Sequence, residues 1–178
     1  MGLGSPVTVS MAEKDDHDVP FPILVERLPN QSDGSWTVNS DGTMKTIYTL
    51  RPNLTWHDGT PLTAADFTFA QKVYTDSAVP ITNRLPETLM SEVVARDVRT
   101  VEIVWKQIYV DAGALVKTQL APLPQHLLEE AFNADKTTFA QNTFFTSDQF
   151  VSDGAFSGHA LGAWRSNLPA GVPQLRPG

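Results

Sequence analysis

The segment Leu62–Phe67 fixes the start of a helix, and it constrains the fold more than any other part of this sequence. Thr63 can accept a hydrogen bond from the first helical turn, and Asp66 can reach back to the backbone of Thr63, which is the capping-box pattern. Leu62 and Phe67 occupy the two positions of a hydrophobic staple. These features predict a helix over residues 64–75. Its apolar positions share one face: Phe67, Ala70, Val73 and Tyr74.

Two strand pairs are predicted on either side of this helix. Residues 35–51 are apolar around Asp41-Gly42, a dipeptide typical of a two-residue type I′ turn. In that register, one face of the hairpin holds Trp36, Val38, Lys45 and Ile47. Residues 93–106 predict the second pair, whose apolar face alternates with polar positions. That face consists of Val101, Ile103 and Trp105.

Further helices are predicted after the second strand pair. Pro124 suits the first turn of a helix over residues 125–132. Asp111 and Asp135 are candidate caps of two short helices, the second reaching residues 139–144. Strands and helices therefore mix along the chain without an internal repeat, and we expect an α+β or α/β fold.

The composition excludes several classes of function. The 178 residues include 13 Lys and Arg against 20 Asp and Glu, a net charge of −7 that is unfavourable for a nucleic-acid or anionic-membrane partner. The absence of Cys excludes disulfides and Cys-ligated zinc. No apolar run approaches the roughly 18–20 residues that span a bilayer. The first residues have neither the basic start nor the apolar middle of a secretory signal peptide.

The chain divides into three predicted parts. Residues 1–18 are rich in Gly and Ser and then in acidic residues, which predicts a flexible N-terminal arm with little to bury. Residues 19–156 carry the apolar patterns of a folded unit. Residues 157–178 contain four Gly and three Pro but no Asp, Glu or Lys. We expect this tail to be disordered and non-native, as if translated in a wrong reading frame.

Candidate catalytic and metal-binding residues are few. His57-Asp58 resembles two members of a catalytic triad, but Asp58 and Gly59 are better explained as turn residues. Asp15-Asp16-His17-Asp18 could hold a cation, although a solvated charged tail explains it more simply. No histidine pair has metal-ligand spacing and no phosphate-binding loop is present. We therefore predict no catalytic residue, metal site or cofactor.

Residues 49–67, TLRPNLTWHDGTPLTAADF, resemble the fingerprint of the family 5 extracellular solute-binding proteins, which are the receptors of peptide, oligopeptide and nickel ABC importers. Asn53 stands where that family usually has glycine, and Asn tolerates a left-handed backbone. Four shorter pieces also resemble family segments: residues 24–29, 34–38, 123–128 and 150–156, the last with Ala155 in place of proline. The resemblance covers residues 19–156.

The resemblance implies the partial first lobe of a periplasmic-binding-protein-like fold of the type II, clamshell kind. Such receptors close two lobes on a peptide or similar solute outside the cytoplasmic membrane and then dock on the membrane permease. Because family members are three to four times longer, we expect a truncated receptor that binds no ligand tightly by itself. Ligand contacts are unknown at this stage. The motif positions expected to be structural are Trp56, Asp58, Gly59, Thr63 and Asp66.

The resemblance also implies a periplasmic or cell-surface location, although the chain shows no signal peptide. Two other functions stay open from the residues. One is a free-standing interaction lobe that acts as an adaptor through an open sheet edge. The other, less favoured, is a hydrolase that uses His57 and Asp58.

Overall fold

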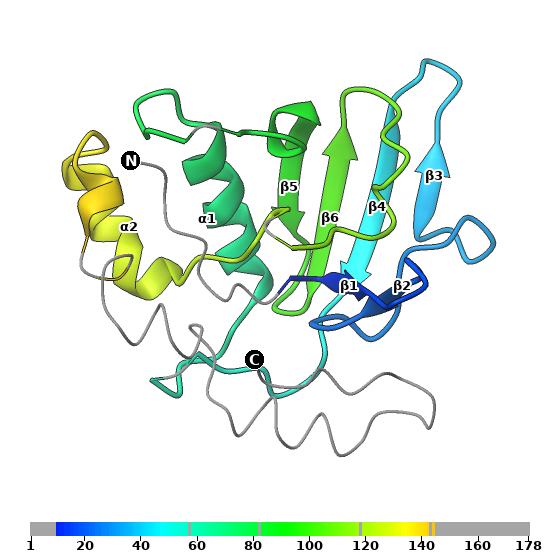
Figure 1. Ribbon diagram of the computed structural model, residues 1–178, viewed down its shortest axis with the longest axis horizontal. Coiled ribbons are helices and arrows are strands. Elements are labelled where there is room, and N and C mark those ends of the chain that lie inside the picture. Colours follow the sequence, from blue (N-terminus) through cyan, green and yellow to red (C-terminus); the bar gives the residue numbers. More distant parts are fainter. Residues whose placement is uncertain (1–9, 57, 82, 118, 143, 145–178) are drawn as a thin grey trace.

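The computed structural model describes residues 10–56, 58–81, 83–117, 119–142 and 144. A four-stranded antiparallel sheet stands beside two α-helices (Figure 1). The strands follow the spatial order β3 (Trp36–Val38), β4 (Met44–Thr49), β6 (Thr100–Trp105) and β5 (Met90–Ala95). Helix α1 (Ala64–Thr75) packs mainly on β5, and α2 (Gln125–Ala134) packs on α1. The mixed class predicted from the sequence is confirmed.

One further strand pair and two 3₁₀ turns are the remaining regular elements of the described residues. Strands β1 (Ala12–Lys14) and β2 (Pro20–Pro22) form a separate antiparallel pair. Single 3₁₀ turns lie at η1 (Glu87–Leu89) and η2 (Phe139–Gln141). No helix in the described part of the chain combines the length and the apolar character that a bilayer crossing requires.

Helix α1 begins and ends where the sequence predicts. Thr63 is its N-cap and both halves of the capping box are present. The predicted face is buried at Phe67, Ala70 and Val73. Phe69 is buried as well, on the side toward α2, where its ring meets Phe132 edge-on at 5.8 Å between centroids. The helix therefore has two apolar faces: Phe67 packs in the cluster against the sheet, and Phe69, Ala70 and Val73 pack in the cluster shared with α2.

The main core lies against one face of the sheet. Strand β4 alternates strictly, with Met44, Thr46 and Tyr48 buried. Their neighbours on β6, Val101, Ile103 and Trp105, are buried too, as predicted. Tyr48 donates to the carbonyl of Ala112 at 2.5 Å, which ties the segment that crosses this face to the sheet. The second core cluster fills the space between α1 and α2.

The register predicted for the first hairpin is wrong by one residue. Trp36 pairs with Thr46 and Val38 with Met44, so the large apolar groups share one face. Gly42 has φ of 84°, whereas Asp41 keeps an ordinary backbone and its carboxylate accepts from the amide of Thr43 at 2.9 Å. The loop therefore has three residues with glycine in the left-handed position, and a type I′ turn is not formed.

The flexible arm predicted for residues 1–18 is wrong for its second half. Met11 and Ala12 are fully buried. The amide of Ala12 donates to the carbonyl of Leu115 at 3.0 Å, and the amide of Ile23 donates to the carbonyl of Met11 at 2.9 Å. These contacts with distant segments order the residues from Ser10 onward. The composition of the sequence does not reveal such contacts. Residues 1–9 and the predicted tail at 157–178 lie outside the described residues.

The short helix predicted after Asp111 is also wrong. The amide of Ala114 donates to the carbonyl of Asp111 at 3.0 Å, which closes one turn. Lys117 and Leu120 have φ of 56° and 46°, and two left-handed residues so close together prevent a right-handed helix. Asp135 caps the end of α2 rather than the start of a helix, and within residues 135–142 the 3₁₀ turn η2 follows it.

Candidate functional site

The segment around Trp56 forms a closed turn. The amide of Trp56 donates to the carbonyl of Thr60 at 2.8 Å, and the amide of Gly59 donates to the carbonyl of Trp56 at 3.0 Å. Gly59 has φ of 84°, a conformation that favours glycine. Asn53, before the turn, has φ of 59°, in line with its replacement of a glycine. The turn buries the Trp56 ring almost completely.

Asp66 collects hydrogen bonds from three segments. Its Oδ2 accepts from the amide of Thr63 at 2.8 Å and faces the Nε1 of Trp56 at 3.4 Å. Its Oδ1 accepts from the amide of Gln125, the first residue of α2, at 3.0 Å. Burial raises the pKa of this carboxyl, and the three donors oppose that effect. Asp66 thus joins the Trp56 turn, the start of α1 and the start of α2.

Asp58 makes a second link between the turn and α2. Its Oδ2 lies 2.8 Å from Nε2 of His126, and its Oδ1 accepts from the amide of Thr60 at 2.9 Å. The bond with His126 lowers the pKa of Asp58 to about 2. The imidazole also lies beside the Trp56 ring, 6.5 Å between centroids and inclined by 50°. Both side chains of the pair are about 30% exposed, so the link is at the surface.

The chemistry of this cluster is that of a structural junction. The Asp58 carboxylate orients a histidine, as in a hydrolase, but no Ser or Thr hydroxyl among the described residues bonds to His126. His57 lies outside the described residues. The cluster fastens α2 to the turn and to α1 by two bonds at consecutive residues, Gln125 and His126.

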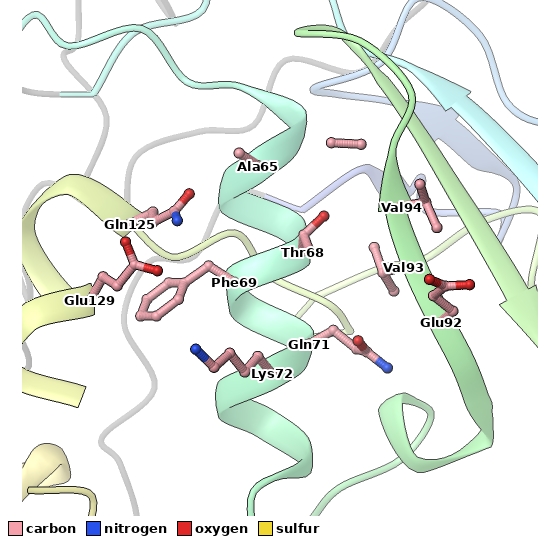
Figure 2. A pocket seen from close by; sticks show the side chains of 11 residues that line it. Ala65, Thr68, Phe69, Gln71, Lys72, Glu92, Val93, Val94, Gln125 and Glu129 are labelled. Carbon is pink, nitrogen blue, oxygen red and sulfur yellow. The ribbon is translucent and has the colours of Figure 1, made fainter. Parts of the chain in front are cut away.

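A hollow of about 570 Å³ opens beside this junction, over the exposed side of α1 (Figure 2). Strand β5 borders it on one side and the start of α2 on the other. Figure 2 shows Thr68 and Gln71 pointing from α1 toward β5, and Val93 pointing from β5 toward α1. The lining mixes polar and apolar groups and includes three charged side chains, Lys72, Glu92 and Glu129.

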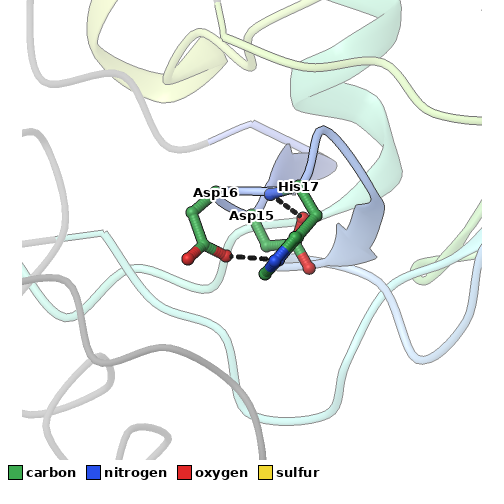
Figure 3. Close-up of side chains that lie close together, drawn as sticks. All are labelled: Asp15, Asp16 and His17. Carbon is green, nitrogen blue, oxygen red and sulfur yellow. Dashed lines mark hydrogen bonds and ion pairs between the residues drawn. The ribbon is translucent and has the colours of Figure 1, made fainter.

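The acidic residues near the N-terminus do come together. Oxygen and nitrogen atoms of Asp15, Asp16 and His17 lie within 4.8 Å of one another (Figure 3). Their groups are used in local bonds: Asp15 Oδ1 accepts from the amides of His17 and Val19, and Asp16 Oδ1 lies 2.8 Å from Nδ1 of His17. The side chains of the Asp16–His17 pair are more than 70% exposed. This arrangement is that of an exposed turn.

The structure brings the motif residues of the sequence together and adds two that sequence reasoning missed. Trp56, Asp58, Thr63 and Asp66 converge around the start of α1. The missed partners are Gln125 and His126. A signal for them was present, because residues 123–128 also resemble a family segment, but nothing in the sequence indicates that the two segments touch.

Comparisons with known proteins identify the family and the fold of this chain. The family model described as "Bacterial extracellular solute-binding proteins, family 5 Middle" matches residues 30–156, more than half of the chain. The oligopeptide-binding protein of Thermus thermophilus, solved with a pentapeptide, is similar over 85% of this chain and 28% of its own, with 20% identity and a TM-score of 0.65. A search of curated proteins gave no match.

Two other solved structures are also similar in fold to this chain. AppA of Bacillus subtilis, in complex with a nonapeptide, has 18% identity and a TM-score of 0.61, over 79% of this chain and 25% of its own. NikZ of Campylobacter jejuni, in complex with Ni(L-His), has 22% identity and a TM-score of 0.57, over 78% of this chain and 26% of its own. At these identities the likeness establishes the fold, a partial lobe of a substrate-binding protein. The chain spans about a quarter of the length of these structures, and it belongs to the bacterial extracellular solute-binding proteins of family 5.

Proposed function

We propose that this chain is part of the substrate-binding component of an ABC importer, which captures peptides or similar small solutes outside the cytoplasmic membrane and delivers them to a membrane permease. The observation that carries the proposal is the family match over residues 30–156. Structural relatives that bind a pentapeptide, a nonapeptide and a nickel–histidine complex support a small-solute ligand. Residues 19–156 would form the partial lobe, and the role is binding, with no catalytic step.

Within that function, Trp56, Asp58, Gly59, Thr63 and Asp66 serve as scaffold. Their bonds run to backbone, to one another and, at Asp58, to the side chain of His126, and these bonds occupy the carboxylates of Asp58 and Asp66. A closing receptor needs lobes that move as rigid bodies, because the ligand shifts the population only through contacts that differ between open and closed states. The junction at Asp66 supplies such rigidity by locking three segments together.

The proposal is tested with the purified full chain. Because a clamshell receptor holds its ligand between two lobes, we expect no change in melting temperature when pooled peptides or nickel–histidine are added. A cooperative transition that rises by several degrees with peptide would leave peptide capture standing and contradict the partial-lobe part of the proposal, because it would show tight binding without a second lobe. Incubation with ester and amide substrates tests the hydrolase alternative, which requires turnover that is lost in Asp58→Asn.

A second candidate is an interaction lobe without transport. The observation that favours it is the position of β5 at the end of the order β3-β4-β6-β5, where no other strand of the described residues pairs with its outer side. Free edges pair readily with other chains. Binding of a partner segment at β5, with no effect of peptides on a complete receptor, would favour this candidate over transport.

A further inference from the structure

Three turns in the described part of the chain share one sequence, Asp-Gly followed by Ser or Thr, and one pattern of hydrogen bonds. In each turn an oxygen of the Asp carboxylate accepts from the amide two residues later at 2.9 Å. The glycine has a φ between 77° and 84°, and its amide donates to the carbonyl three residues earlier. The three turns are Asp33-Gly34-Ser35, Asp41-Gly42-Thr43 and Asp58-Gly59-Thr60.

An Asp-Gly sequence can convert to isoaspartate without an enzyme, because glycine has no side chain that hinders its nitrogen. The glycine nitrogen bonds to Cγ of the aspartic acid, and the carboxyl hydroxyl leaves with the nitrogen's proton as water. The succinimide ring then takes up water. When the ring opens at the main-chain carbonyl, the chain runs through Cβ and Cγ, and the mass is unchanged. The carboxyl group and the glycine nitrogen must first leave their hydrogen bonds, so the rate follows local opening of the turn.

The carboxylate of Asp41 is held by one residue. Both the amide and the hydroxyl of Thr43 donate to its Oδ1, at 2.9 and 2.6 Å. No side chain in the described part of the chain forms a hydrogen bond or ion pair with its Oδ2. Asp41 is exposed at the tip of the hairpin of β3 and β4. Opening of the contact with Thr43 therefore releases this carboxyl group.

The carboxylate of Asp58 is held through both oxygens. Oδ1 accepts from the amide of Thr60, and Oδ2 lies 2.8 Å from Nε2 of His126, 68 residues away on α2. The bond with His126 lowers the pKa of Asp58 to about 2. The Thr43 hydroxyl lowers the pKa of Asp41 as well, so the feature that separates the two turns is the additional bond to α2.

The turn at Asp33 is the intermediate case. Its Oδ2 lies 3.5 Å from Nε of Arg27, a side chain that is 72% exposed. An ion pair this exposed holds a carboxylate only weakly. The clearest comparison is therefore between Asp41, which has no partner outside its own turn, and Asp58, which has one on a helix.

We propose that Asp41-Gly42 is a site of spontaneous isoaspartate formation in the folded chain, and that His126 protects Asp58-Gly59 from the same reaction. The protection falls where the fold needs it. An extra main-chain carbon at Asp41 would disturb the tip of one hairpin, whereas one at Asp58 would disturb the turn that buries Trp56. This inference does not depend on solute transport, so its failure leaves the transport proposal untouched.

The experiment incubates the purified full chain in neutral buffer and follows isoaspartate at both sites by peptide mapping with electron-transfer fragmentation, which locates the extra main-chain carbon. We expect Asp58-Gly59 to convert about two- to fivefold more slowly than Asp41-Gly42, the factor given by one partly exposed hydrogen bond. In concentrated urea the two rates should be nearly equal, because glycine follows both residues. Equal rates in the folded chain, or a difference that persists in urea, would overturn the proposal.

Variants at position 126 test the protecting residue. His126→Ala should raise the rate at Asp58-Gly59 about two- to fivefold and leave the rate at Asp41-Gly42 unchanged, which gives a control within the same chain. His126→Gln retains a side-chain N–H donor and should keep the rate at Asp58-Gly59 closer to that of the parent. If His126→Ala leaves the rate at Asp58-Gly59 unchanged, or raises both rates equally, protection by His126 is excluded.

Discussion

His126 and Asp58 are bonded side chain to side chain at 2.8 Å across 68 residues of sequence. The bond fastens the first turn of α2 to the turn that precedes α1. One residue earlier, the amide of Gln125 donates to Asp66. Gln125 and His126 of α2 therefore bond to Asp66 and Asp58, respectively. Residues 56–66 thus join the two helices as well as forming a turn.

Loss of the surface bond should have a small, coupled effect. Asp58→Asn and His126→Ala should each lower the free energy of unfolding by about 1 kcal/mol or less, since both groups are partly exposed. The double variant should lose less than the sum of the two, because the pair shares one interaction. Urea denaturation measures all three, with His17→Ala, at the exposed Asp16–His17 pair, as the control. Strict additivity would show that the bond does not form in solution.

The two motif carboxylates should respond to pH in opposite directions. The pKa of Asp58 is lowered from 3.8 to about 2. The contribution of the Asp58 carboxylate to the free energy of unfolding is therefore fully present above about pH 4 and is lost as pH falls toward 2. Burial raises the pKa of Asp66, so the folded state holds this proton more tightly, and its contribution to stability falls as pH rises above 3.8. Asp58→Asn should flatten the acid limb of stability between pH 4 and 2. An unchanged acid limb would contradict the depressed pKa.

Removal of the buried Asp66 carboxylate should lower the free energy of unfolding much more than removal of the Asp58 carboxylate at the surface. Asp66→Ala leaves the amides of Thr63 and Gln125 and the indole of Trp56 without their acceptor. Unsatisfied buried donors cost about 1–3 kcal/mol each, so we expect a loss of about 3 kcal/mol or more. Asp66→Asn keeps one acceptor oxygen and should lose less. Chemical denaturation that places both variants within about 1 kcal/mol of the parent would refute the junction.

Gly113 is required by the ring of Trp36. A Cβ at position 113 would lie 2.6 Å from Cζ3 and 3.0 Å from Cε3 of that indole. Gly113→Ala should therefore destabilise the fold by about 1–3 kcal/mol, as overpacking does. In a Trp36→Leu background the same substitution should cost clearly less, because the obstructing ring is gone. Equal costs in the two backgrounds, measured by thermal unfolding, would show that the contact is not tight.

Local signals predicted the elements whose ends are fixed by neighbouring residues. Thr63 and Asp66 determine the start of α1, and the alternation of Val101, Ile103 and Trp105 determines the buried face of β6. Distant contacts determined what the sequence did not reveal. Ser10–Lys14 is ordered by a bond to Leu115, and the crossing segment after Asp111 is shaped by left-handed residues at Lys117 and Leu120. The same holds for the site: the turn was predicted, but its partners Gln125 and His126 lie about 60 or more positions away.

We propose that residues 30–156 are lobe scaffold of a larger solute receptor. A hybrid in which this segment replaces the matching segment of the oligopeptide-binding protein of Thermus thermophilus, titrated calorimetrically with a pentapeptide, tests this role. We expect saturable peptide binding by the hybrid, together with loss of binding when the hybrid carries Asp66→Ala. A folded hybrid that binds no peptide, while the isolated chain binds it tightly, would contradict a scaffold role for residues 30–156.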